Sequence, residues 1–214
     1  MSPSNHRARG ELTPKGQQTR LRIVRAAADL MFEFGVAGTT VEDVRVAAQV
    51  SSSQIYHYFA DKQALVRAVI DYQTDTIVGG QEPMLLSLDS LDGLRAWRDF
   101  LIEHQRQLQC RGGCPIGSLG SELAEVDQQA RVDVAAGFAR WEAAIRGGLR
   151  AMHRVGRLVP EADADALALA TLAALQGGLL LTQLQRDTRP LETSLDAMLT
   201  LIAAQVTPSP GGPE

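Results

Sequence analysis

The sequence predicts an all-α protein in which a small N-terminal three-helix domain precedes a larger helical domain. Three observations support this fold class. Apolar residues recur at helical spacing along most of the chain, capping motifs precede several of these runs, and two of the shortest runs are separated by only two or three residues. With 214 residues, of which 45% are hydrophobic, the chain can form a sizeable core without disulfide bonds.

The first two helices are predicted by periodicity and capping. An apolar stripe runs from Ile23 to Phe34 at helical spacing, with Gly35 as its C-terminal stop. Thr39 and Thr40 each stand three residues ahead of an acidic residue, which makes a doubled capping box. This box opens a second, short helix whose predicted apolar face consists of Val41, Val44, Ala47 and Ala48.

A third short helix, "SSQIYHY", is predicted by the capping box of Ser51 and Gln54. Ile55 is its inward anchor, with Val50 and Phe59 packing at its two ends. The outward face is left with hydroxyl, amide and ring polar groups. Two short helices joined by a tight turn behind a longer one form a helix-turn-helix, in which the later helix enters the major groove and applies such groups to phosphates and base edges.

A fourth helix is expected to begin at Lys62, with Asp61 as its N-cap. A lysine in the first turn lies where the helix macrodipole is also positive, so a phosphate bound at this helix start would account for it. A solvated lysine that tolerates a small dipole penalty is the alternative.

Charge is distributed unevenly along the chain. Residues 1–67 contain nine Lys and Arg against six Asp and Glu, whereas the other 147 residues contain twelve against nineteen. This division favours a basic module that meets a polyanion, attached to an acidic body that does not. A chance fluctuation in surface charge is the alternative.

Residues 23–65 resemble the DNA-binding domain of the tetracycline-repressor (TetR) family of transcriptional regulators. The motifs "IVRAAADLMFEFG", "TTVEDV" and "VSSSQIYHYFADKQAL" carry the resemblance. It implies a dimer that places two recognition helices about one DNA turn apart, ~34–36 Å. It also implies base and nearby phosphate contacts by Ser52, Ser53, Gln54, Tyr56 and His57, and phosphate clamping by Thr40, Tyr58 and Lys62.

Three positions depart from the family pattern. Arg45 and Gln49 stand where the family usually has a small residue and Gly, and Ser53 replaces a common Gly. A left-handed Gln49 would cost roughly 1–2 kcal/mol. Arg45 either reaches a phosphate from the edge of the second helix or snorkels over the surface.

The rest of the chain is predicted to be helical over 91–108, 116–125, 128–154, 162–186 and 192–204, while "VGGQEP" at 78–83 breaks the fourth helix and marks a candidate boundary. The predicted domains are a flexible basic arm (1–18), the helix-turn-helix domain (19–66), a ligand-binding and dimerisation domain (67–206) and a disordered tail (207–214).

The last two long helices are apolar around most of their circumference, so they must be covered on more than one face. Packing against a second copy would give a four-helix dimer interface; a monomeric core is the alternative. Residues 166–182 approach the length of a membrane span, but Gln176 interrupts them. We expect a cytoplasmic protein with no membrane contact, because no apolar run follows the basic N-terminal residues.

The resemblance implies an effector pocket among the middle helices of the second domain. Gln176 and Gln183 lie seven residues apart on one apolar helix, so their amides either orient a ligand or satisfy each other or a buried water. We expect a small apolar effector and no cofactor or metal. The candidate ligand-binding residues are Trp97, Phe100, Leu101, His104, Cys114, Trp141, Ile145, Gln176, Leu180 and Gln183.

The segment "CRGGCPIGS" supports an alternative, a thiol-based sensor of oxidants or electrophiles. Cys114 precedes Pro115, a favoured first residue of a helix, where a positive helix N-terminus can lower a thiol pKa. Cys110 could then resolve an oxidised Cys114. Buried, inert cysteines are the other reading.

An enzyme is not expected. Paired Glu-x-x-His motifs, G-x-S-x-G and phosphate-binding glycine loops do not occur in the sequence. The expected function is a ligand-responsive regulator of transcription. Its partner is double-stranded operator DNA, and it acts as a repressor that an effector releases by shifting the helix that begins at Lys62. A DNA-binding protein without a ligand is the alternative.

Overall fold

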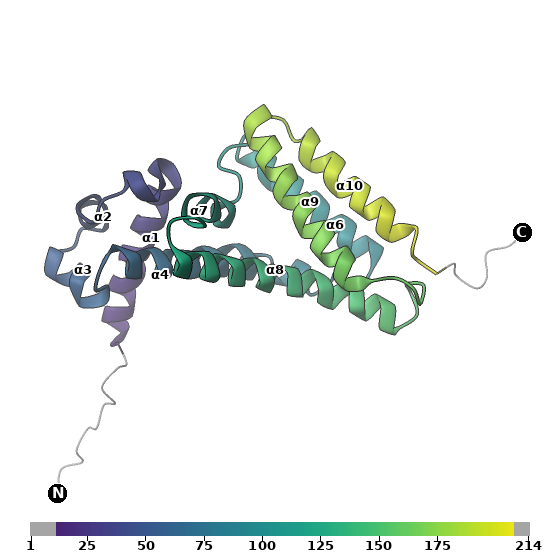
Figure 1. Ribbon diagram of the computed structural model, residues 1–214, viewed down its shortest axis with the longest axis horizontal. Helices are drawn as coiled ribbons and strands as arrows, with labels where there is room; N and C mark the ends of the chain where they lie inside the picture. Colours follow the sequence, from purple (N-terminus) through teal and green to yellow (C-terminus); the bar gives the residue numbers. More distant parts are fainter. Residues whose placement is uncertain (1–11, 208–214) are drawn as a thin grey trace, which may run out of the picture. The chain divides into compact units, whose positions relative to one another are not determined.

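The computed structural model describes residues 12–207, and these form two compact units, one ending at Tyr72 and the other beginning at Gln73 (Figure 1). Within the described residues there is no β-strand, only an isolated bridge between Leu158 and Val206. The chain is therefore all-α, as the sequence predicts. The tail predicted over 207–214 lies outside the described residues except for Thr207.

The first unit contains α1 (Pro14–Gly38), α2 (Val41–Ala48), α3 (Ser52–Tyr58) and most of α4 (Lys62–Thr74). The side chain of Thr13 caps α1 by accepting a hydrogen bond from the Gly16 amide at 3.2 Å. The arm predicted over residues 1–18 is therefore too long at its end, because residues 14–18 are helical; residues 1–11 lie outside the described residues. Gly35, with a φ of 75°, kinks α1 at the predicted stop.

The core of the first unit is close to the predicted one. Ile23, Ile55 and Phe59 are all buried, as is Val50 at the start of α3. Two predictions were wrong in detail. Phe34, at the end of the α1 stripe, is 57% exposed, and Ala47 is exposed because the inward face of α2 consists of Val44 and Ala48.

α4 runs on without a break, so no structural discontinuity marks residue 66, where the first domain was predicted to end. It leads into a π-helix, η1 (Asp75–Gly79), and a short helix, α5 (Glu82–Leu85), neither of which was predicted. The break expected at "VGGQEP" is softened because Gly80 keeps helical angles, φ −64° and ψ −20°.

The remaining helices of the second unit follow the prediction within three residues at each end. They are α6 (Leu91–Gln107), α7 (Pro115–Leu123), α8 (Gln128–Arg154), α9 (Ala164–Gln185) and α10 (Arg189–Ala203). Figure 1 shows α9 and α10 side by side, with α6 behind them. Among the helices of residues 12–207, α9 alone is long and apolar enough to cross a membrane, and 44% of its most apolar window is buried in the protein.

The core of the second unit is built from α6, α8, α9 and α10. Trp97 and Trp141 are its largest fully buried side chains, with Ile145 and Leu149 beneath them. Gly178 lets α10 approach α9, since a Cβ atom there would lie 2.5 Å from the Ser194 Oγ. This close approach of two helices occurs within the chain.

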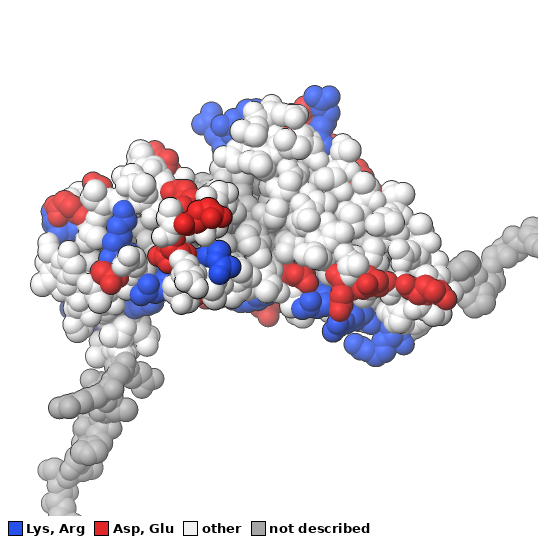
Figure 2. Space-filling view, in the orientation of Figure 1, with Lys and Arg blue, Asp and Glu red and all other residues white. Residues whose placement is uncertain are grey.

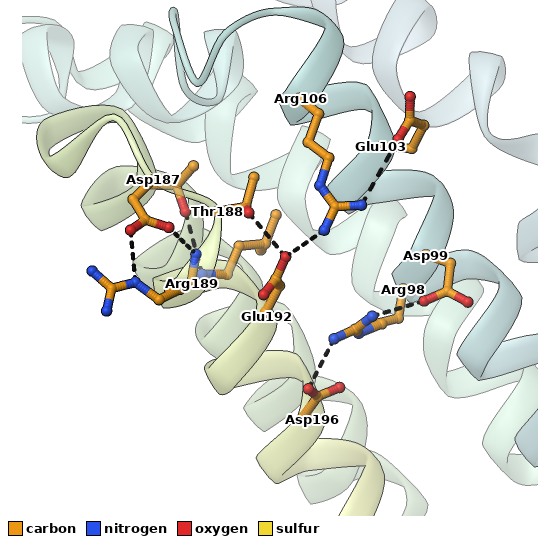
Figure 3. Close-up of polar contacts among 11 residues, drawn as sticks. Arg98, Asp99, Glu103, Arg106, Asp187, Thr188, Arg189, Glu192 and Asp196 are labelled. Carbon is orange, nitrogen blue, oxygen red and sulfur yellow. Dashed lines mark hydrogen bonds and ion pairs between the residues drawn. The ribbon is translucent and has the colours of Figure 1, made fainter.

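Ion pairs link α6 to α10 along the surface of this core (Figure 3). Arg98 lies 2.8 Å from Asp196, and Arg106 lies 2.8 Å from Glu192. These pairs are partly exposed, so each contributes at most about 1 kcal/mol. Both pairs join α6 to α10.

Candidate DNA interface and ligand pocket

Capping boxes fix both short helices of the first unit. The Thr40 Oγ1 accepts from the Asp43 amide at 3.1 Å, and an Asp43 carboxylate oxygen accepts from the Thr40 amide at 2.8 Å. Ser51 and Gln54 repeat the arrangement at the start of α3, at 3.3 and 2.9 Å. The hydrogen bonds from Thr40 lower the pKa of Asp43 below its ordinary value. Both helix starts are thereby satisfied and α3 is rigidly presented.

The turn between α2 and α3 passes through Gln49, which has φ 53° and ψ 51°. This is the left-handed conformation that glycine adopts without strain. The Gln49 and Val50 amides donate to carbonyl oxygens of Val46 and Arg45 and so close the helix end. The turn therefore keeps the helix-turn-helix geometry at the cost of about 1–2 kcal/mol expected for a residue with a Cβ atom.

The outward face of α3 is polar and uncovered. The side chains of Ser52, Ser53, Gln54, Tyr56 and His57 are exposed, with Tyr56 58% exposed. Tyr58 is half-buried and makes an edge contact with the ring of His57, with centroids 4.9 Å apart. A row of hydrogen-bonding groups on a fixed helix is what readout of the major groove requires.

Two basic residues at the edge of this face already have protein partners. The Arg45 guanidinium donates to both carboxylate oxygens of Glu42, at 2.8 and 2.5 Å, which lowers the pKa of Glu42. The Lys62 Nζ donates to the Val36 carbonyl at 2.7 Å. Lys62 thus ties the start of α4 to the end of α1, a role that sequence reasoning missed, and keeps two further N–H donors.

Arg22 makes a second hydrogen bond between helices of the first unit that was not predicted from the sequence. Its Nε donates to the Ala48 carbonyl at 2.9 Å, where the last carbonyl groups of α2 need donors. The only sequence indication was its charge. The bond anchors α2 on α1 directly before the turn.

The second unit contains a cavity of about 290 Å³ bounded by η1, α6, α7, α8 and α9. This volume is at the small end of the range for ligand sites, ~300–1,000 Å³. None of the described residues that line it is Asp, Glu, Lys or Arg. The lining residues are Thr76, Ile77, Gly80, Gln81, Phe100, Leu101, His104, Gln105, Gly113, Cys114, Pro115, Trp141 and Leu179.

Polar groups in this wall fall into two kinds. The Gln81 amide is paired at both ends, because its oxygen accepts from the Trp97 Nε1 at 2.8 Å and its nitrogen donates to the Ile77 carbonyl at 3.0 Å. By contrast, the Trp141 Nε1 and the Gln105 Oε1 are buried without a hydrogen-bond partner. Buried polar atoms are nearly always paired, so on these two lining residues a ligand can supply the missing partners.

The ten predicted ligand-binding residues divide between this cavity and its surroundings. Five of them line it, namely Phe100, Leu101, His104, Cys114 and Trp141. Trp97 and Ile145 lie in the core, since Trp97 is turned to Gln81 and Ile145 is fully buried. Leu180 is 56% exposed because it lies on the outer face of α9.

The two glutamines of α9 lie beside the lining. Gln176 lies against Gly117, next to Cys114, and Gln183 lies against Gly113. Gly113 has a φ of 63°, which favours glycine, and a Cβ atom there would lie 2.4 Å from the Gln183 Oε1, so the amide would have to move. The sequence analysis missed Gln105 and the η1 residues, which no periodicity singled out.

Cys114 is the N-cap of α7, and its Sγ accepts from the Gly117 amide at 3.4 Å. Burial raises the pKa of the Cys114 thiol, and the hydrogen bonds from the Gly117 and Ile116 amides offset this only in part. A raised pKa favours the neutral thiol, which argues against the reactive thiolate that the redox alternative requires. Cys110 is buried, whereas Cys114 is half-buried.

A second hollow, of about 450 Å³, lies along α8 next to α5. It is lined in part by Glu82, Asp89 and Arg140 and by the exposed side chain of Leu86. The unpartnered buried polar atoms of the described residues do not belong to its lining. It is an outer groove, and the smaller cavity is the better candidate site.

Comparisons with known proteins agree with this geometry. Residues 23–69 match the model for bacterial regulatory proteins of the tetR family, and residues 90–197 match the C-terminal domain of LmrA/YxaF-like transcriptional regulators. The chain is 29% identical over 191 residues to an uncharacterised HTH-type regulator of Lactococcus lactis, covering 86% of this chain and 93% of that protein.

Two further relatives are similar over nearly the whole chain. The HTH-type transcriptional repressor DhaR of a Mycobacterium species is 24% identical over 193 residues, 89% of this chain and 93% of the relative. A TetR regulator from Chloroflexus aurantiacus is similar in structure, with a TM-score of 0.76 and 29% identity, covering 91% of this chain and 98% of that one. These proteins are transcriptional regulators, not enzymes. With both its helix-turn-helix and its C-terminal domain matched, the chain belongs to the TetR family of bacterial transcriptional regulators.

Proposed function

We propose that this protein is a dimeric, ligand-responsive repressor that binds a near-palindromic operator in double-stranded DNA. The observation that carries the proposal is the face of α3: five exposed polar side chains stand on a capped helix whose one buried residue is Ile55. In this family such a helix belongs to the DNA-binding domain. The named repressor DhaR supports the repressor role. A DNA-binding regulator of this kind acts in the cytoplasm.

The DNA contacts follow from the positions of the side chains. Ser52, Ser53, Gln54, Tyr56 and His57 meet base edges and adjacent phosphates. A second set at the rim clamps phosphates and consists of Thr40, Arg45, Tyr58 and Lys62. The Arg45 guanidinium would then bind both a phosphate and Glu42. Lys62 would donate to a phosphate with the two N–H groups that are not bonded to the Val36 carbonyl.

The dimer forms through α9 and α10. Figure 2 shows the surface over these helices almost without charge between charged rims. Leu169, Leu180 and Leu184 of α9 are 57%, 56% and 70% exposed, and Leu201 of α10 is 46% exposed. A contiguous exposed apolar patch marks an interaction surface, and a two-fold contact would cover it with the same patch of a second copy.

The effector occupies the cavity of the second unit. Its wall includes η1, which is continuous with α4, and α4 begins at Lys62 four residues after α3 ends. A ligand that packs on Thr76 and Ile77 acts on the helix that leads directly to the DNA-reading segment. If the ligand binds more tightly to one of two positions of this helix, it favours that position. Operator affinity can then change by at most the ratio of the ligand's two affinities.

The test is a titration of the protein against labelled DNA from its own upstream region at about 150 mM salt, with random-sequence competitor. Specific retention on a near-palindromic segment is expected. Lys62→Ala should weaken binding to all sequences and reduce the salt slope by about 0.9. Binding that competitor abolishes would contradict the operator proposal.

A further inference from the structure

We infer that the effector is an uncharged molecule whose polar group both accepts and donates a hydrogen bond, such as a carboxamide. The inference rests on the proposed effector role of the 290 Å³ cavity and defines the chemistry that this cavity selects. It is carried by two buried, unpartnered polar atoms in the wall, the indole N–H of Trp141 and the amide oxygen of Gln105.

The two tryptophans of the chain make the contrast plain. Both are buried to 2% exposure or less, yet the Trp97 N–H donates to Gln81 at 2.8 Å whereas the Trp141 N–H has no partner. An indole nitrogen is only a donor, so the missing partner of Trp141 is an acceptor. Leaving such a group unpaired costs on the order of a hydrogen bond, and a ligand that supplies the acceptor recovers that cost.

Gln105 supplies the complementary requirement. It is 3% exposed, and its Oε1 accepts nothing, so the matching ligand atom is a donor. Gln107, two residues along the same helix, provides the contrast, because it is exposed and bonds to Glu103 at 3.3 Å. Arg98 Nε of the same helix is also buried without a partner but lies outside the lining, so Gln105 is the α6 residue whose unpaired atom belongs to the cavity wall.

The lining disfavours a formal charge on the ligand. A carboxylate or an ammonium group moved from water into this cavity would find no Asp, Glu, Lys or Arg among its described lining residues, and His104 is the one lining side chain that can carry a positive charge. Burial of an unpaired ion is strongly unfavourable. A neutral ligand that offers one acceptor and one donor can pair the two unpartnered atoms without this penalty, and a primary carboxamide is the simplest group that carries both.

The size and shape of the cavity limit the remainder of the molecule. Most of the lining is apolar, and the rings of Phe100 and His104 lie nearly parallel, at 9° with centroids 6.2 Å apart. A flat apolar body of one or two rings fits a volume of about 290 Å³. Naphthalene derivatives are therefore suitable probes.

The experiment measures binding to the full-length protein by ligand-detected NMR or calorimetry with four probes that share one body. These are 2-naphthamide, 2-naphthoate, 2-naphthylmethylammonium and 2-methylnaphthalene. We expect 2-naphthamide to bind about tenfold or more tightly than each of the other three. Gln105→Leu and Trp141→Phe should each remove most of this preference, whereas Gln107→Leu should leave it unchanged.

The inference is overturned if the carboxylate or the ammonium probe binds as tightly as the amide, if no probe binds, or if both cavity variants keep the preference. Trp141→Phe enlarges a buried space, so thermal unfolding is recorded in parallel. Gln105→Leu, which removes an unpaired buried oxygen, is expected to retain or raise stability and keeps the test decisive.

Operator release is measured separately with the same probes. Binding of the amide without release of operator would support the inferred selectivity of the cavity and contradict its proposed effector role. Release of operator by a charged probe would support the proposed function and contradict the inference.

Discussion

α3 and α9 both present an uncovered face, but the two faces have opposite chemistry. α3 exposes hydroxyl, amide and ring polar groups and buries Ile55. α9 buries leucines on one side and exposes others, including Leu169, Leu180 and Leu184, on the other. A polar face is solvated without a partner, whereas an apolar face gains free energy when covered. The first is suited to a reversible contact with DNA and the second to a lasting contact with another copy.

The largest expected effect comes from placing a charge on the α9 face. Leu184→Arg should break the dimer, because a buried unpaired guanidinium is strongly unfavourable at an apolar interface. Loss of the second half-site contact should lower operator affinity by ~10²-fold or more. Analytical ultracentrifugation and an operator titration measure the two losses.

Val126→Arg is the matched control for this charge. Val126 is 78% exposed but follows α7, away from α9 and α10 in sequence. It should leave the sedimentation coefficient and the affinity unchanged. A Leu184→Arg protein that remains dimeric would show that the α9 face is not the interface.

A substitution on the α3 face should have a smaller effect on operator binding. Gln54→Ala removes an exposed amide and should lose about 1–3 kcal/mol of discrimination between the operator and a single-base variant of it. It also removes the bond from the Ser51 amide, so part of the loss is helix capping. Ser51→Ala separates the two, because it removes the cap and leaves the amide. Equal loss of specificity in both variants would assign Gln54 to capping alone.

The first unit was the more predictable part of the molecule because its information is local. Both capping boxes, the buried anchor Ile55 and the limits of α3 follow from neighbouring residues. The hydrogen bond from Lys62 to Val36 was missed because it spans 26 residues and depends on how α1 ends. Sequence reasoning placed the charge correctly but could not identify its partner in the folded chain.

The cavity was the less predictable part for the same reason. Its lining residues are spread from residue 76 to residue 179. The sequence singled out only those with an aromatic ring or a thiol, and Leu101 beside Phe100. Gln105 was overlooked, since a glutamine on a helix is ordinary until its oxygen is known to be buried without a partner. Leu180 was misplaced because an apolar helix does not reveal which of its faces turns outward.

A substitution in the turn between α2 and α3 should change stability while leaving the exposed faces of α3 and α9 unchanged. Gln49→Gly relieves a left-handed residue with φ 53°, and the gain should be about 1 kcal/mol in the free energy of unfolding. Chemical denaturation measures it, and the base preference of the operator complex should not change. Gln17→Gly, in the exposed part of α1, is the opposite control and should destabilise by about 1 kcal/mol. An unchanged or lower stability for Gln49→Gly would mean that the turn is not strained.

The smallest expected effect concerns acid. The hydrogen bonds from Thr40 lower the pKa of Asp43 in the folded protein, so this carboxylate adds stability above its ordinary pKa, near 4, and loses that contribution as the pH falls through the folded value. Asp43→Asn cannot ionise and should therefore lose less stability than the wild type between about pH 5 and pH 2.5. Thermal unfolding across this range measures the difference in slope. The lowered pKa values of Asp165 and Asp187 are common to both proteins and cancel in the difference, whereas the charge of Asp43 also acts on the pKa of Glu42 and raises it. Parallel pH profiles would show that the capping box at α2 stabilises the helix-turn-helix through neutral hydrogen bonds alone.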